Sequence, residues 1–93
     1  MPERLRFSPR AIRDLKRLAH PIQEAVLEDL GRLAASTQFP GPPKLKKLKG
    51  HGDLYRLRTG EYRAVCRIAS GKISVLRVLD RKDLEGILSR LWG

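Results

Sequence analysis

Acidic residues, cysteine and aromatic residues are all scarce in this sequence. The 93-residue chain has ten Asp and Glu against twenty Lys and Arg, one Cys, one Trp, two Tyr and two Phe. A single cysteine, Cys66, excludes an internal disulfide framework and a zinc site built from several cysteines. No apolar run reaches membrane-spanning length, and the opening residues, MPERLRF, lack the apolar segment of a signal peptide. We therefore expect no membrane association and a cytoplasmic location.

The positive charge is the strongest signal in the composition. The formal net charge is +10 and the isoelectric point is near 10.7. Such a field favours a polyanionic partner, either a nucleic acid, an acidic protein or an anionic membrane surface. The membrane is disfavoured because no amphipathic helix carries bulky aromatic residues. The alternative is a charged surface that only aids solubility. The length predicts one domain, 1–93, with one modest core.

The first part of the chain predicts a strand followed by two helices. Residues 4–7 alternate between arginine and apolar side chains, which is typical of a short strand. Ser8-Pro9 predicts a helix start, with a side-chain cap and then a proline in the first turn. Apolar residues recur at helical spacing to about Ala19. His20-Pro21 interrupts them and opens a second helix that extends to about Ala35. So short a break predicts an antiparallel helix pair.

The second part of the chain changes to a period of two. Residues 36–43, STQFPGPP, form a loop by composition, and residues 44–50, KLKKLKG, form a basic run. The later elements are three strands, at 54–58, 62–69 and 72–79, and a helix at 83–92. The third strand is apolar on both faces, which favours an interior position in the sheet. We predict an α+β fold in which the helices pack on one face of a three-stranded antiparallel meander and leave the other face open.

Arginines in the first hairpin are predicted to share one face of the sheet. A Thr59-Gly60 turn would pair Arg56 with Arg63, and a Gly60-Glu61 turn would pair Arg58 with Arg63. Because strand side chains alternate between faces, both registers place the same four arginines together. These are Arg56, Arg58, Arg63 and Arg67. The opposite face, which can pack under the helices, carries Tyr55, Leu57, Tyr62, Ala64, Cys66 and Ile68.

The second hairpin extends this basic surface. A Ser70-Gly71 turn would pair position 63 with position 78 and bring Arg81 beside the first turn, within reach of Arg63. Four lysines flank the same region: Lys44, Lys46, Lys47 and Lys49. Because the guanidinium fork suits phosphate, we interpret this surface as an anion site. No Gly-rich phosphate loop is present and the surface is too small for a nucleotide, so no cofactor is expected. The alternative is that the arginines only cover an exposed face.

These segments resemble the RelE/ParE superfamily, the small basic toxins of type II toxin–antitoxin systems. The resemblance rests on KLKG, then GDLYRLRTGEYRAVCRI, a short hairpin and VLRVLDRKD. It covers about Leu45 to Asp83, and the strand–helix–helix opening also fits, which implies a RelE-like fold. RelE-like members cut mRNA in the ribosomal A site. They use no metal, and the RNA 2′-hydroxyl attacks the adjacent phosphate. ParE-like members instead poison DNA gyrase.

The resemblance also assigns roles to the arginines. Arg63 of the GEYR segment and Arg81 of the terminal RKD correspond to phosphate and transition-state contacts in RelE-like toxins. Arg56 and Arg58 stand where the best-known members have lysines, one of which is a proposed general base. Arginine stays protonated, so it can hold charge but is a poor base.

The identity of the general base is left open by the sequence. Asp80 replaces the histidine of the usual motif, Glu85 stands near the position of a base-stacking tyrosine, and His51 titrates in a useful range. The predicted catalytic residues are Arg56, Arg58, Arg63, Arg81 and Glu85. The predicted RNA-binding residues are Lys44, Lys46, Lys47, Lys49 and Arg67. No metal site is predicted.

The leading hypothesis is therefore a ribosome-dependent mRNA endonuclease toxin. The alternatives are a gyrase inhibitor, or a catalytically weakened member that binds RNA or its antitoxin. The expected partners are the ribosome, mRNA and a small antitoxin with an acidic segment, and that complex could form a higher oligomer. A supercoiling assay separates the second hypothesis from the first, and a translation assay separates the first from the third.

Overall fold

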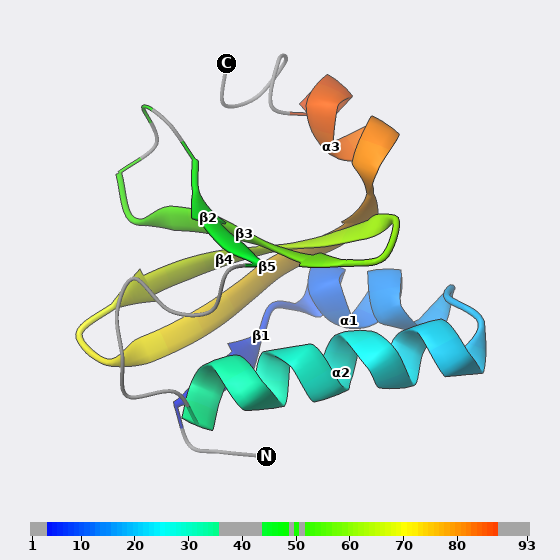
Figure 1. The fold of residues 1–93 in the computed structure, drawn as a ribbon, viewed down its shortest axis with the longest axis horizontal. Helices are drawn as coiled ribbons and strands as arrows, with labels where there is room; N and C mark the ends of the chain where they lie inside the picture. Colours follow the sequence, from blue (N-terminus) through cyan, green and yellow to red (C-terminus); the bar gives the residue numbers. More distant parts are fainter. Residues whose placement is uncertain (1–3, 36–43, 49, 51, 88–93) are drawn as a thin grey trace.

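The structure, a computed structural model, describes residues 4–35, 44–48, 50 and 52–87. Its elements in chain order are β1 (Leu5–Phe7), α1 (Pro9–Lys16), α2 (His20–Ala35), β2 (Leu45–Lys47), β3 (Leu54–Thr59), β4 (Tyr62–Ala69), β5 (Lys72–Asp80) and α3 (Arg81–Ile87). The strands form one five-stranded sheet in the order β1-β5-β4-β3-β2 (Figure 1). The predicted α+β class is therefore confirmed.

Two short outer strands were not fully anticipated. The predicted meander is present as β3, β4 and β5, and β5 lies inside the sheet as expected. β1 extends the sheet by pairing parallel to β5, and β2 pairs antiparallel to β3. The sequence suggested only a basic run at the position of β2. A three-residue strand is too short for alternation to distinguish it from a loop.

The helix boundaries follow local capping chemistry. Ser8 is the N-cap of α1, because its Oγ accepts a hydrogen bond from the Ala11 N–H at 3.0 Å. α1 ends at Lys16, one turn before the predicted end. α2 begins at His20 as predicted. α3 begins at Arg81, two residues early, because Asp80 Oδ1 accepts from the Lys82 N–H at 2.8 Å. Residues 88–92 of the predicted last helix, and Lys49 and His51, lie outside the described residues.

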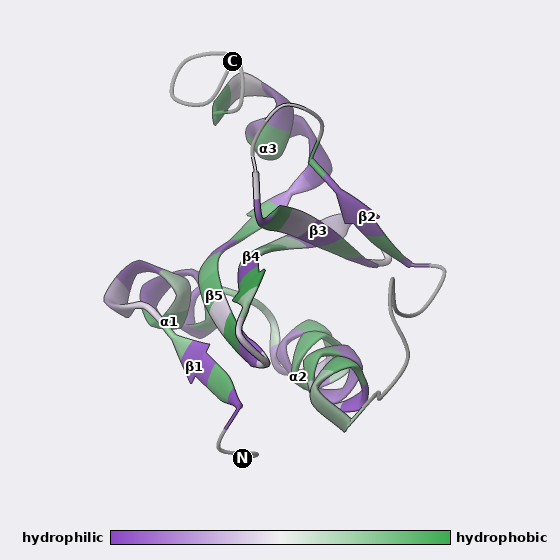
Figure 2. Ribbon diagram, turned by 90° about the vertical axis from the view of Figure 1, so that its left-hand side faces the viewer, coloured by the Kyte–Doolittle hydropathy of each residue, from purple (hydrophilic) through white to green (hydrophobic). Residues whose placement is uncertain are grey.

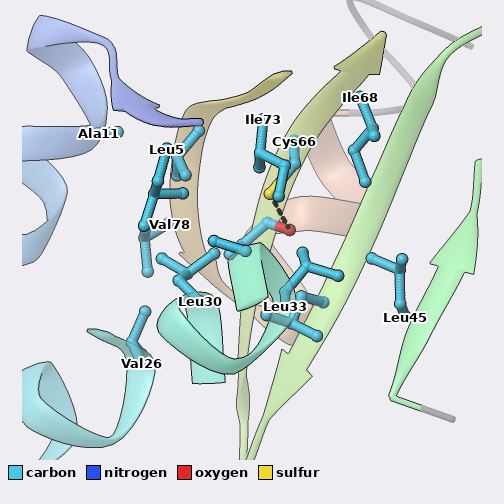
Figure 3. Packing of buried hydrophobic residues seen from close by; sticks show 14 of the residues in the cluster. Leu5, Ala11, Val26, Leu30, Leu33, Leu45, Cys66, Ile68, Ile73 and Val78 are labelled. Carbon is cyan, nitrogen blue, oxygen red and sulfur yellow. Dashed lines mark hydrogen bonds between the residues drawn. The ribbon is translucent and has the colours of Figure 1, made fainter. Parts of the chain in front are cut away.

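The main core lies between the sheet and the first two helices. Val26, Leu30 and Leu33 of α2 meet apolar residues from the sheet, including Cys66 and Val78 (Figure 3). Figure 2 shows that α2 and the strands of the sheet both carry hydrophobic stretches, coloured green. Cys66 is fully buried, and burial raises the pKa of its thiol to about 12. The cysteine is therefore a packed core residue.

The last helix corrects the predicted arrangement. α1 and α2 cover one face of the sheet, and α3 lies against the other (Figure 1). Leu84 of α3 is buried in a second cluster with Leu48, Leu54, Val65 and Leu79. Val65 and Leu79 place apolar side chains on the arginine face, and packing of α3 removes these side chains from water. The prediction that all helices pack on one face is wrong for α3.

The second hairpin has the predicted turn but a shifted register. Ser70 and Gly71 both have positive φ, 51° and 74°, as a two-residue primed turn requires. A register shift between Val65 and Cys66 leaves Leu76 as an extra residue in β5. Arg63 therefore pairs with Leu79 and not with position 78. The predicted pairing missed this irregularity, for which the sequence has no marker.

Candidate anion-binding site

The first hairpin places the arginines as expected. Arg58 pairs with Arg63, which selects the Gly60-Glu61 turn from the two alternatives. Gly60 takes a positive φ of 58°, a conformation that favours glycine. Arg56 pairs with Val65 and Leu54 pairs with Arg67. The four arginines therefore share one face of the sheet, and that prediction is confirmed.

A pocket of about 370 Å³ opens on this face beside α3. It is lined by Lys44, Lys46, Arg56, Arg58, Arg63, Arg81, Leu84 and Glu85. Strand β3 supplies Arg56 and Arg58, and strand β4 supplies Arg63. The two lysines come from β2 and the residue before it, and the remaining three residues come from α3. Among the described residues, six cations and one carboxylate thus line this space. All five predicted catalytic residues and two of the predicted RNA-binding lysines meet here.

Two other predicted RNA-binding residues, Lys47 and Arg67, do not line the pocket. Lys47 pairs with Tyr55, so strand alternation directs it to the opposite face from Lys46. Arg67 shares the arginine face but lies further along β4, beyond the buried Val65, and its Nε is 3.3 Å from Asp53 Oδ1. Lys49 lies outside the described residues. The sequence overestimated the basic surface because the β2 pairing and the α3 cover were not known.

Arg63 is the most constrained cation in the pocket. Its Nη1 donates to the carbonyls of Gly60 at 2.9 Å and Tyr62 at 3.0 Å, which holds the half-buried side chain against the turn. Its pKa lies below the ordinary value, first because of desolvation and then because of the charges of Arg56, Arg58 and Arg81, while Glu61 acts in the opposite sense. Arginine remains protonated at neutral pH, so the repulsion persists as a positive potential that attracts anions.

Arg81 joins α3 to the first turn. Its backbone N–H donates to the Glu61 carbonyl at 2.9 Å, and its exposed Nε lies 4.0 Å from Glu61 Oε2. Arg81 therefore sits beside Arg63 as the sequence predicted, despite the shifted register. An exposed pair at this distance neutralises little of the charge. Glu61 lies at the turn and is not among the residues that line the pocket.

Of the two candidate bases that the structure describes, Asp80 and Glu85, Glu85 lines the pocket. Asp80 uses a side-chain oxygen to accept from the Lys82 N–H at the start of α3. His51 lies outside the described residues. Glu85 follows Leu84 on α3, and the burial of Leu84 against the sheet fixes the helix that carries it. Among the described residues, no group of three or more His, Cys, Asp or Glu side chains could hold a metal ion.

Two features of the site were missed by the sequence. The apolar wall that Leu84 gives to the pocket was assigned to the opposite face. Asp29 of α2 contacts both Lys44 and the end of β3, although it is 15 residues from one and 30 from the other. Only its position on the helix could have indicated that it faces the sheet.

The fold and the site together define a small α+β domain with a cationic pocket between one face of its sheet and its last helix. Residues 5–85 match a family model described as ParE toxin of type II toxin-antitoxin system, parDE. The chain therefore belongs to the RelE/ParE superfamily of toxins of type II toxin–antitoxin systems, which confirms the resemblance. A comparison with curated protein sequences gives no match.

Solved structures give the same assignment. The RelB-RelE antitoxin-toxin complex from Methanococcus jannaschii matches with a TM-score of 0.71 and 28% identity over 86% of this chain and 94% of that one. The toxin-antitoxin complex RelBE2 from Mycobacterium tuberculosis matches with a TM-score of 0.66 and 31% identity over 87% and 100%. The RelE-RelB complex from Pyrococcus horikoshii OT3 matches with a TM-score of 0.66 and 26% identity over 87% and 97%. The fold is thus that of RelE toxins.

No helix within the described segments has the length and apolar character needed to cross a membrane.

Proposed function

We propose that this toxin is a metal-independent endoribonuclease that cuts mRNA on the translating ribosome. The observation that carries the proposal is the pocket itself, where four arginines surround a space that also contains Glu85. The similarity to RelE structures supports the same reading. The site would act in the cytoplasm, where its substrate is found.

In the proposed reaction an RNA 2′-hydroxyl attacks the adjacent phosphorus. The new O–P bond gives a 2′,3′-cyclic phosphate, and the bond to the 5′ oxygen breaks to release a 5′-hydroxyl. Glu85 takes the proton of the attacking hydroxyl, and solvent returns a proton to the leaving oxygen. Negative charge grows on the phosphate oxygens in the transition state, and Arg63 and Arg81 lie where they can stabilise it. Arg56 and Arg58 hold the flanking backbone.

The direct test uses purified ribosomes that translate a defined mRNA. We expect cuts within the codon in the A site, with 5′-hydroxyl and cyclic-phosphate ends. The same mRNA without ribosomes should remain intact over the same period. Intact mRNA in the translating reaction, with the protein shown to be folded, contradicts the proposal. Ribosome binding without cleavage would indicate a weakened, RNA-binding member.

The role of Glu85 is tested by a change of charge at constant shape. The substitution Glu85→Gln removes the base and keeps the size of the side chain, so we expect cleavage to slow by about 10²- to 10⁴-fold. RNA binding should be retained, because a negative charge has been removed from a cationic pocket. The matched control is Asp80→Asn, which keeps a capping oxygen at the start of α3. A large loss in the control and none in Glu85→Gln would assign the base to Asp80.

Gyrase inhibition is the second candidate, because the matching family model carries the ParE description. Gyrase inhibition needs no general base. This fits the presence of Arg56 and Arg58 where the best-known RelE-like toxins have lysines, one of which is a proposed general base. A supercoiling assay with purified gyrase distinguishes the two functions. The endonuclease proposal predicts no effect on supercoiling at concentrations that cut mRNA. Inhibition of supercoiling together with intact mRNA would make gyrase the target.

We also propose that an antitoxin with an acidic segment covers this pocket. The net charge of +10 favours an acidic partner, and the similar toxins from Methanococcus jannaschii and Mycobacterium tuberculosis are found in antitoxin complexes. Protection of Arg63 and Arg81 from arginine-directed chemical modification in the complex would support this arrangement. Unchanged modification would place the antitoxin elsewhere.

A further inference from the structure

We propose that Asp29 of α2 is a positioning residue for the arginine pocket and that it limits the affinity of the pocket for anions. Asp29 lies on the helix-covered side of the sheet and does not line the pocket. It would act on the pocket through two residues, Thr59 and Lys44. The inference deepens the proposed function, and it rests on that function only for its cleavage measurements.

Asp29 is a shared acceptor at one corner of the sheet. Its side chain is only 12% exposed. Its Oδ2 accepts a hydrogen bond from Thr59 Oγ at 2.8 Å and lies 3.4 Å from the Lys44 Nζ. Thr59 ends β3 and Lys44 immediately precedes β2, and the Arg58 N–H donates to the Lys44 carbonyl at 3.1 Å. Asp29 thus fixes two neighbouring chain segments to the same helix.

The bond to Thr59 positions the turn that holds Arg63. Thr59 directly precedes Gly60, and the Gly60 carbonyl accepts from Arg63 Nη1 at 2.9 Å. Thr59 points toward α2, whereas Arg58 and Arg63 lie on the opposite face. The helix therefore holds Thr59 on one side of the turn, and the Gly60 carbonyl of the same turn orients Arg63 on the other side. A looser anchor would let the guanidinium shift relative to the phosphate, and shifts of about 1 Å can cost two orders of magnitude in rate.

The contact with Lys44 affects charge more than geometry. Lys44 lines the pocket, yet its ammonium is directed to Asp29 around the outermost strand. A bound phosphate must compete with this carboxylate for the ammonium. Removing the negative charge would free Lys44 for the phosphate and also raise the local potential. The consequence is that loss of the contact between Asp29 and Lys44 should tighten anion binding.

Three variants separate the two roles. Asp29→Asn keeps an oxygen for Thr59 but loses the charge, Thr59→Val loses the hydrogen bond but keeps the charge, and Asp29→Ala loses both. Binding is measured with a 2′-O-methyl RNA oligonucleotide, which has no attacking hydroxyl, over a range of salt concentrations. Positioning is measured by the kcat for mRNA cleavage on ribosomes and by the NMR shift of the Arg63 Nε–H group.

The matched control is Glu28→Gln on the same helix. Glu28 is 62% exposed and pairs with Arg32, whose Nη1 also lies 3.8 Å from Asp29 Oδ1. The substitution therefore removes one negative charge beside the same arginine without touching Thr59 or Lys44. Asp29→Asn should tighten oligonucleotide binding about two- to fivefold over this control. Its salt dependence should steepen by about 0.7 in log–log slope, the value for one more phosphate contact on a single strand. Its kcat should fall less than that of Asp29→Ala, because the amide oxygen can still accept from Thr59.

The two variants that lose the Thr59 hydrogen bond should lose activity. Thr59→Val and Asp29→Ala should lower kcat by about tenfold or more and shift the Arg63 Nε–H signal, with the fold intact. Thr59→Val should not tighten binding. The inference is overturned if Asp29→Asn binds like Glu28→Gln and if the Arg63 signal is unmoved in Asp29→Ala. Because the binding and NMR measurements need no cleavage, these results stay distinct from a failure of the endonuclease proposal.

Discussion

Arg63 and Arg77 lie on neighbouring interior strands, but Arg77 is paired with a carboxylate whereas Arg63 is surrounded by other arginines. Arg77 of β5 is 17% exposed and makes a two-pronged contact with Asp14 of α1, with Nε–Oδ2 at 2.8 Å and Nη2–Oδ1 at 3.2 Å. Asp14 also accepts from the Val78 N–H at 2.9 Å. Arg63 of β4 faces the other arginines, and within the described part of the chain its side chain hydrogen-bonds to carbonyls of its own turn.

The pKa values of the two arginines move in opposite directions for this reason. The hydrogen bond and charge of Asp14 raise the pKa of Arg77 against the effect of burial. Desolvation and three like charges lower the pKa of Arg63. The fold pairs the partly buried Arg77 with a carboxylate but leaves the four pocket arginines clustered around a single carboxylate among the described lining residues. The difference indicates that Arg77 serves stability and that the charge at Arg63 is kept for a ligand.

Breaking the Arg77 pair should give the largest loss of stability. Asp14→Ala leaves a partly buried cation and the Val78 N–H without their acceptor, so we expect the unfolding free energy to fall by about 2–3 kcal/mol. Urea denaturation measures the change. Because α1 and the pocket lie on different parts of the sheet, protein that remains folded should still bind the 2′-O-methyl oligonucleotide. A fall in the unfolding free energy of less than about 1 kcal/mol would mean that the Arg77–Asp14 pair contributes no more than an exposed ion pair.

Breaking the Arg63 site should affect activity and spare stability. Arg63→Ala removes a prearranged donor to the transition state, so we expect mRNA cleavage to fall by about 10²- to 10³-fold. The unfolding free energy should be unchanged or slightly higher, because repulsion from three arginines is relieved. Arg67→Ala is the matched control, since it removes an arginine from the same strand and face outside the pocket. Equal losses in both variants would contradict the site assignment.

The core is tested by the buried thiol of Cys66, which carries no charge, in contrast to the arginines of the pocket. Burial raises the pKa of Cys66 from 9.0 to about 12, so the folded state keeps a proton that the unfolded state loses in this range. The resulting stability is complete below pH 9 and is lost as the pH rises toward 12. Between these values wild type should lose about 1.4 kcal/mol more per pH unit than Cys66→Ala. Parallel curves from urea denaturation at several alkaline pH values would exclude a buried, protonated thiol.

The smallest effect should come from the exposed pair on the arginine face. Asp53 and Arg67 are each about half exposed, with 3.3 Å between their charged atoms. Asp53→Ala should change the unfolding free energy by less than about 1 kcal/mol, and added salt should reduce the difference. The same denaturation assay, run with and without salt, measures it. A loss as large as that of Asp14→Ala would mean that exposure does not separate the two pairs.

Strand periodicity and turn chemistry account for what the sequence predicted well. The alternation in residues 54–69 fixed which arginines share a face, because both possible turns give the same result. Ser8-Pro9 and Ser70-Gly71 carried local signals strong enough to locate a helix start and a hairpin turn. These features depend on neighbours in the chain, which a single sequence contains.

The missed features depend on contacts between distant segments. The bulge at Leu76 coincides with the Ser8 Oγ donating to the Leu76 carbonyl at 2.8 Å across 68 residues. The face on which α3 packs depends on its contacts with Val65 and Leu79. These two apolar residues could equally belong to strands that no helix covers. Asp29 meets Thr59 only because α2 crosses the end of β3. No local pattern encodes such contacts, so Lys47 and Arg67 could not be separated from the pocket lysines and arginines in advance.

The most direct test of the account is induced expression of the wild type beside an Arg63→Ala, Arg81→Ala double variant, with growth and mRNA 5′ ends followed together. The account predicts that the wild type stops growth and produces new 5′-hydroxyl ends at ribosomal A sites. The double variant should accumulate to the same level, grow normally and leave mRNA intact. Growth arrest by both proteins, or arrest by the wild type with mRNA intact, would contradict the claim that these arginines hold and cleave RNA.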